Sequence, residues 1–224
     1  RAAALQYEHA AALALKASRR VEELGFLDAA LQAYEHEHSQ AQAFRVAHQA
    51  LSASMAVETP GATEARVQAL QAAASSDAQR LQALLAASRQ RLCLSDGAGA
   101  LEPSRQALAL AQSLGHAEQQ AVAAGWHGLA LALVQRNAEG LHLFEAALPT
   151  VEGFSEARAQ LDFYGAYGYA LHCAARYREA LGPLRRAAAL AERLGDLAEA
   201  MDQHCNVAVC LNTLGEQEQA LLTH

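Results

Sequence analysis

The chain has 224 residues, of which 52% are hydrophobic but only 5% aromatic, and its formal net charge is −7. Alanine and leucine, which are strong helix formers, make up most of the apolar content, and strand-favouring Val, Ile and Thr are scarce, so the composition predicts an all-α protein. An acidic chain repels phosphate backbones, which argues against direct binding of nucleic acid. No apolar run approaches the ~20 residues that a membrane span needs.

The four cysteines, Cys93, Cys173, Cys205 and Cys210, show no C-x-x-C spacing and lie in apolar helical stretches. This pattern predicts buried thiols, not disulfides or a zinc site, and it fits the reducing cytoplasm. The chain begins with arginine and carries no signal peptide. We therefore expect a segment of a larger cytoplasmic protein that needs no cofactor.

Residues 1–60 are expected to form an N-terminal helical hairpin. A helix over about 5–24 should turn at Gly25 and return as a long helix over about 27–57, which Thr59-Pro60-Gly61 ends. Residues 61–77 should form a connecting helix, with Ser75-Ser76-Asp77 capping the next one.

Glu35 and His38 have the Glu-x-x-His spacing that di-metal helix bundles use. Such bundles need a second pair of this kind and further glutamates. A solvated polar face is therefore the favoured interpretation, and no metal site is assigned.

Residues 78–224 carry an internal repeat with a 40-residue period, visible first as an 80-residue offset between Ala100 and Ala180. Small residues recur at fixed positions, which means that two helices approach closely there. The columns are Ser88, Gly128, Gly168 and Ala208; Ala100, Gly140, Ala180 and Ala220; and a leucine column of Leu101, Leu141, Leu181 and Leu221.

Each repeat is expected to consist of two antiparallel helices joined by short polar turns. The first helices should span about 78–94, 118–135, 157–174 and 198–214; the second helices should span about 98–114, 138–151, 177–194 and 217 onward. Gly115 and Gly195 follow leucines at helix ends, where glycine supplies a left-handed cap. The array therefore comprises about four repeats, of which the last is truncated.

Within these repeats the chain resembles the tetratricopeptide repeat (TPR) family, in which a small residue is followed twelve positions later by Ala and seven later again by Ala. The spacing is kept by Gly128, Gly140 and Ala147, and again by Gly168, Ala180 and Ala187. Ser18, Ala30 and Tyr34 lie at repeat spacings in the N-terminal part, out of register with the later repeats. The resemblance implies an α-solenoid in which antiparallel helix hairpins stack as a right-handed superhelix.

The 40-residue period is longer than the usual 34 and resembles the TPR regions of bacterial MalT-like transcriptional regulators. The stretch LDAALQAYEHEHSQAQAFRVAHQAL resembles the last helical pair of TPR-containing diguanylate cyclases. The resemblance implies a regulatory module that binds a protein, a peptide or a small-molecule ligand. The alternative is a constitutive assembly scaffold without a ligand switch.

In the TPR family the first helix of each repeat lines a concave groove, and residues spaced i, i+4 and i+7 share one helix face. The resemblance implies a groove built from the following residues: Arg89 with Leu85 and Leu92, then Leu129 with Gly125 and Ala132, then Gly165, Tyr169 and His172, then Cys205, Val209 and Asn212, flanked by Trp126 and Asn206, with Asp162 and Asp202 at the rim. Gly165 should leave room for a ligand. Tyr169 and His172 could instead fill the space between helices.

Two further patterns could carry chemistry. His172-Cys173 and His204-Cys205 are neighbours in sequence and point about 100° apart on a helix, so they do not form catalytic dyads by themselves. No phosphate-binding glycine loop or serine nucleophile elbow is found, and no enzyme activity is expected. A cluster of arginines is interpreted as a solvated face, with an anionic partner as the alternative; it comprises Arg176, Arg178, Arg185, Arg186 and Arg193.

The last predicted helix would leave uncovered the face that a further helix should cover. Repeat arrays need polar terminal caps, so we expect self-association through the truncated ends or a disordered end.

Overall fold

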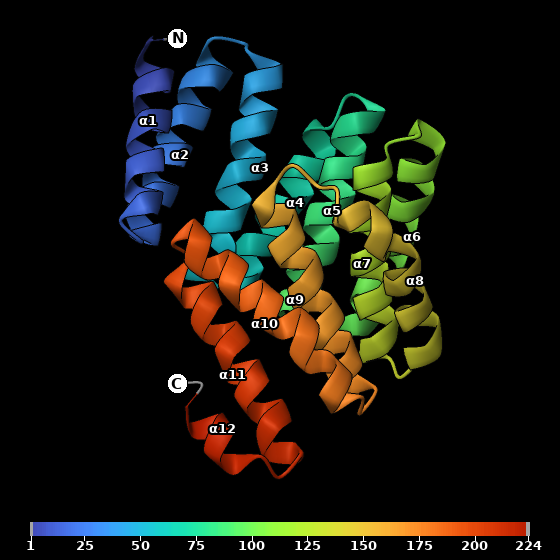
Figure 1. Ribbon diagram of the computed structural model, residues 1–224. Helices are drawn as coiled ribbons and strands as arrows, with labels where there is room; N and C mark the ends of the chain where they lie inside the picture. The colour runs from blue at the N-terminus through green and yellow to red at the C-terminus, as the bar shows by residue number, and fades with distance from the viewer. Residues whose placement is uncertain (1, 223–224) are drawn as a thin grey trace. The chain divides into compact units, whose positions relative to one another are not determined.

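The computed structural model describes residues 2–222, and within that range the chain forms twelve α-helices and no strand (Figure 1). The helices are α1 (Ala2–Lys16), α2 (Arg20–His36), α3 (Gln40–Val57), α4 (Pro60–Ala73), α5 (Asp77–Cys93), α6 (Gly97–Leu114), α7 (Ala117–Leu133), α8 (Asn137–Val151), α9 (Ala157–Cys173), α10 (Tyr177–Leu194), α11 (Leu197–Thr213) and α12 (Gln217–Leu221). None of these helices is long and apolar enough to cross a membrane.

The chain divides into two compact units, Arg1–Leu94 and Ser95–His224. The boundary falls in the turn between α5 and α6, the two helices expected to form the first repeat. The pairing of those two helices, and the division into 1–60, 61–77 and 78–224, therefore stay predictions.

The first unit contains α1 to α5 around two hydrophobic clusters. One cluster joins α1, α2 and α3 through residues such as Leu27, Tyr34 and Val46, and the other joins α3, α4 and α5 through Phe44 and Leu70. The expected two-helix hairpin is wrong, because residues 2–57 form three helices.

The error has a local cause at the turns. Ser18 and His38 adopt positive φ angles of 56° and 55° and reverse the chain without glycine. Gly25, the expected turn, lies inside α2, where a side chain would meet no atom within 4 Å. Ser18 thus lies in a turn and is no helix-contact residue.

Two arginines tie these helices together. Arg45 of α3 donates to Glu8 of α1 at 2.8 Å, and the same carboxylate accepts a 2.6 Å hydrogen bond from Tyr34 of α2.

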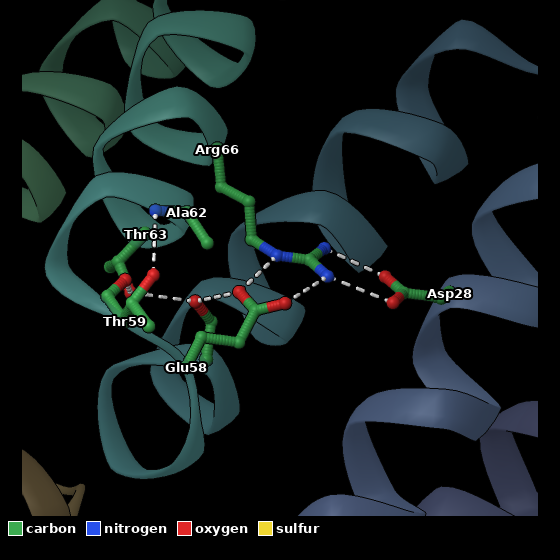
Figure 2. A network of polar contacts seen from close by, with 7 residues as sticks. Asp28, Glu58, Thr59, Ala62, Thr63 and Arg66 are labelled. Carbon is green, nitrogen blue, oxygen red and sulfur yellow. Dashed lines mark hydrogen bonds and ion pairs between the residues drawn. The ribbon is translucent and has the colours of Figure 1, made fainter.

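The second of these arginines, Arg66 of α4, makes the network in Figure 2. Its Nη1 lies 2.7 Å from Asp28 of α2, and its Nε lies 2.7 Å from Glu58 at the end of α3. Ser54 Oγ also donates to Glu58 at 2.6 Å, and it lies 3.0 Å from Thr63 Oγ1. One guanidinium therefore joins three helices.

The second unit contains α6 to α12, and the helix bounds over 95–222 follow the predicted ones closely. The turns that follow α5, α7, α9 and α11 share one backbone feature: Ser95, Gln135, Ala175 and Gly215 have positive φ and lie 40 residues apart. Gly115 and Gly195 end α6 and α10 with φ of 69° and 72°, which confirms the predicted left-handed caps.

Glycines of the small-residue columns lie at close contacts between the two helices of a repeat. A side chain on Gly140 of α8 would collide with the backbone oxygen of Gly128 of α7. A Cβ on Gly168 of α9 would lie 2.5 Å from Cγ of Leu184 of α10. The leucine column is less uniform: Leu141 is buried, whereas Leu221 is 78% exposed.

Gly140→Ala is therefore expected to lower the free energy of unfolding by about 1–3 kcal/mol, because the obstacle is backbone and cannot rotate away. Gly182→Ala is the matched control, since Gly182 is an exposed helical position of α10 where an added Cβ meets nothing within 4 Å. That change should raise stability by about 0.5–1 kcal/mol. Urea unfolding of both variants measures the difference, and equal effects would contradict the assigned contact.

Arg66→Ala is expected to destabilise the first unit by about 1–2 kcal/mol at neutral pH, because it leaves two half-buried carboxylates unpaired. The hydrogen bond from Arg66 lowers the pKa of Glu58 below its ordinary value of 4.5. A depressed acid pKa stabilises the fold above its unfolded value and loses that contribution as pH falls through the folded value. The gap between parent and variant should thus shrink below about pH 4.5. The exposed pair Arg80–Asp77 provides a control: Arg80→Ala should cost under about 0.5 kcal/mol.

Candidate binding surface

The first helices of successive repeats, α7, α9 and α11, follow one another in the second unit. Gly125 of α7 lies against the ring of Phe163 of α9, where an added Cβ would be 3.1 Å from Cδ2. Gly165 of α9 lies in the same way against the amide of Gln203 of α11, at 3.0 Å from its Nε2. Gly125 and Gly165, two members of the i, i+4, i+7 face expected from the sequence, thus each lie against the first helix of the next repeat.

Burial along this face changes at α11. Ala121 of α7 is 4% exposed and Leu161 of α9 is 1% exposed, yet Met201, which occupies the same register position in α11, is 67% exposed. Similarly, Leu129 is 8% exposed and Val209, two repeats later, is 50% exposed. Burial is partial elsewhere in the row, since Tyr169 of α9, equivalent to Val209, is half-buried, and Ala117 of α7, equivalent to Leu197, is exposed. Met201 and Val209 are nevertheless more exposed than their equivalents in α7 and α9.

We call this surface the α11 face. It follows one row of the helix with i, i+4 spacing, and it is apolar along its whole length. Its members are Leu197, Met201, Cys205 and Val209, all exposed, with the exposed polar residues Asp202 and Asn212 beside them.

The expected room beside Gly165 is filled. The side chain of Gln203, which is 7% exposed, lies over the glycine and donates to Glu199 at 2.8 Å. Its Oε1 is buried and has no hydrogen-bond partner. Gly165 thus allows the Gln203 side chain of α11 to pack closely on α9.

Asp162, expected at the groove rim, is engaged in an ion pair. Arg158 donates to Asp162 at 3.1 Å and to Asp196, the N-cap residue of α11, at 2.6 Å. The nearby carboxylates Asp162 and Asp196 raise the pKa of Arg158 against the opposing effect of burial. This pair fixes the start of α11 to α9.

Tyr169 and His172 of α9 stack on one another, with ring centroids 5.9 Å apart, and His172 also meets Tyr177 edge-on at 5.3 Å. Across the helix contact, Cys210 Sγ of α11 lies 3.6 Å from His172 Nδ1. Burial raises the pKa of the Cys210 thiol, so the group stays protonated near neutral pH and is no activated nucleophile. His172 therefore takes part in the packing between α9 and α11.

The remaining candidate residues lie apart from this surface or beside it. Arg89 belongs to the first unit and donates to Ser52 at 3.2 Å. Trp126 and Asn206 are half-buried, and Ala132 is buried. The groove assignment as a whole stays a prediction.

The structure separates Glu35 from His38, because α2 ends at His36 and His38 lies in a turn with positive φ. The two side chains thus do not share a helix face. Across residues 2–222, no group of three or more His, Cys, Asp and Glu side chains is placed to hold a metal ion.

The arginine cluster is largely paired with carboxylates. Arg176 pairs with Glu179 and Glu145, and Arg178 lies 3.0 Å from Glu216. Arg186 lies over the ring of Tyr164, 4.3 Å from its centroid. These pairings favour the solvated-face interpretation over an anionic partner.

One recurring contact was missed at the sequence level. Gln120 of α7 donates to the Ala111 carbonyl of the preceding second helix, and Gln160, one repeat later, donates to the Val151 and Phe154 carbonyls. The two glutamines share a register position, which is the signal that could have identified them. They satisfy carbonyl groups at helix ends.

Comparison with solved structures confirms the all-α, TPR-like helical-repeat fold. A Rap protein complexed with competence and sporulation factor is similar, with a TM-score of 0.67 and 13% identity over 99% of this chain and 62% of that chain. The apo form of RapI gives a TM-score of 0.58 and 10% identity over 98% of this chain and 94% of that one. A putative kinesin light chain from Podosopora anserina with TPR-like repeats gives 0.50 and 12% identity over 89% and 90%.

This chain thus spans 62% of the length of the first Rap protein. No protein-family model and no curated protein sequence matches it. At these identities, the likeness establishes the fold.

His172→Ala is expected to lower the free energy of unfolding by about 1–3 kcal/mol, because it removes the partner of the buried Cys210 thiol and two ring contacts. His142→Ala, at an exposed position of α8, is the control and should change stability by under about 0.5 kcal/mol. Thermal or urea unfolding compares them. Equal stability of the two variants would show that His172 does not contribute to packing. The hypothesis that His172 contacts a ligand would then be favoured.

Proposed function

We propose that this chain is a non-catalytic, TPR-type binding module of a larger bacterial signalling or transcriptional regulator, acting in the cytoplasm. The observation that carries the proposal is the α11 face. At the register position of Met201, α7 and α9 hold the buried Ala121 and Leu161. The α11 face itself holds Leu197, Met201, Cys205 and Val209, all exposed.

The geometry favours a helical segment of a protein as the docking partner. In this chain the equivalent faces of α7 and α9 are each partly covered by another α-helix. The α11 face offers the same straight apolar row, and the exposed Asp202 and Asn212 can bind polar groups at its edge. A partner helix with an apolar stripe at i, i+4 spacing complements it.

Two observations support the regulatory context. The long repeats resemble those of MalT-like regulators and of TPR-containing diguanylate cyclases. A Rap protein of the same fold forms a complex with competence and sporulation factor. A DNA-binding or cyclase domain in the same polypeptide would add support.

The docking surface can be tested with a phage-displayed library of amphipathic helical peptides selected against the chain. Selected peptides should bind the parent protein and lose at least about tenfold in affinity for Met201→Asp, because the change puts a charge into an apolar contact. Val21→Asp provides the control, since Val21 is a 73% exposed apolar residue of α2 in the other unit. It should leave binding unchanged.

Selection of no helical peptide would contradict the proposal. The same holds if the selected peptides bind Met201→Asp as tightly as the parent. Circular dichroism of each variant establishes that the fold is retained.

A further inference from the structure

We propose that the contact between α6 and α7 is sensitive to pH, and that protonation of His127 loosens α7 from α6. The inference concerns a different part of the second unit from the α11 face, and it does not depend on the proposed function. It rests on a hydrogen bond between the two helices and on the charged groups around it.

The hydrogen bond joins Ser104 of α6 to His127 of α7. Ser104 is completely buried, and its Oγ lies 2.9 Å from His127 Nδ1. The Ser104 hydroxyl donates to the carbonyl of Ala100 in its own helix at 2.6 Å. Because a hydroxyl has one proton, its oxygen then accepts the Nδ1–H of His127. In the neutral imidazole the proton is thus on Nδ1, and acid adds the second proton at Nε2.

A second proton on His127 creates an unfavourable charge. The side chain is half-buried, and burial is the largest cause that lowers its pKa from the usual value of 6.5. The guanidinium groups of Arg136, at the start of α8, and Arg105, in α6, lower this pKa further, whereas Glu139 of α8 raises it. Glu139 is already paired with Arg136, and Arg105 is paired with Glu102. The net effect of these groups and of burial is against the cation.

A histidine pKa that is lower in the folded chain weakens the contact in acid. Above about pH 6.5 the imidazole is neutral whether α7 is packed or detached, so the contact keeps its full strength. As pH falls through 6.5, a detached His127 binds the proton more readily than a packed one. The free energy that holds α7 on α6 therefore decreases until the packed form is protonated as well.

The equivalent contacts of the later repeats are built from side chains that do not titrate near neutral pH. Forty residues on, Phe144 of α8 and Tyr167 of α9 stack with ring centroids 5.1 Å apart. Burial raises the pKa of Tyr167 above its usual value of 10.0. After a further forty residues the positions hold Leu184 and Val207, both buried. Acid should therefore act on α6 and α7 and leave the contacts of α8 with α9 and of α10 with α11 unchanged.

NMR of the histidine rings tests the titration directly. His127→Gln identifies the His127 resonance by its loss, and that resonance should titrate below pH 6.5 in the parent chain. Arg136→Gln, at an exposed position, removes a positive charge and frees Glu139, so the same resonance should titrate at higher pH in that variant. Titration of the parent at or above pH 6.5, or no upward shift in Arg136→Gln, would overturn the inference.

Urea unfolding tests the effect on stability. Trp126, the single tryptophan, precedes His127 in α7, so its fluorescence reports unfolding at this contact. Glutamine does not titrate, and its amide can still donate to Ser104. Between about pH 7.5 and about pH 5, the urea midpoint of the parent should therefore fall more than that of His127→Gln.

Two comparisons isolate His127 in that measurement. His142→Gln, at an exposed position of α8, should follow the parent. His48 of the first unit has a pKa lowered by burial and by Arg89, but it is present in all of these chains and its effect cancels. Equal falls for the parent and His127→Gln would overturn the inference. If His127→Gln does not fold, Arg136→Gln replaces it and should show a smaller fall than the parent.

Hydrogen–deuterium exchange, corrected for the intrinsic effect of pH on exchange, tests the location. In the parent chain, acid should reduce protection in α6 and α7 more than in α9 and α10, and His127→Gln should lack this difference. A uniform loss of protection across the second unit, or an undiminished local loss in His127→Gln, would show that this contact is not the pH-sensitive one.

Discussion

The close approach of paired helices at small residues is the constraint on which the second unit depends. Gly128 and Gly140 leave no space between α7 and α8 for a side chain, and Gly168 does the same beneath Leu184. Because these contacts recur at the repeat spacing, they set the register of each hairpin and, through it, the face that each first helix turns toward the next. The exposed row of α11 occupies the same register as Gly125 and Gly165, which lie against the next first helix.

Much of the fold could be predicted because these contacts leave a mark in the sequence. Small residues repeating at one spacing identify helix pairs, and the helices over 117–213 lie close to their expected positions. The N-terminal helices could not be placed, since their turns use Ser18 and His38 in left-handed conformation. A propensity argument looks for glycine there, and the available glycine, Gly25, lies inside a helix.

The candidate groove stays a prediction. Residue spacing puts Gly125, Gly165 and Cys205 at equivalent places on successive helices. Residue spacing cannot show which residues cover this face in each repeat, because the cover depends on contacts between repeats, such as Phe163 against Gly125. Likewise, Cys210 and His172 are distant in sequence and meet only when α11 packs on α9, so no local pattern predicts their contact.

The residues of α11 that do not belong to its exposed face contact α9. Gln203 packs on Gly165, and Cys210 contacts His172. The N-cap residue Asp196 accepts a hydrogen bond from Arg158, so α11 contacts α9 at three points along its length. A partner that displaced Met201 or Val209 would move all three contacts together, because they lie on the same helix. A rotation of α11 would therefore change the packing of the Gln203 amide, the Cys210 contact and the Asp196 ion pair at the same time, and binding at the exposed face of α11 would be coupled to the position of α9.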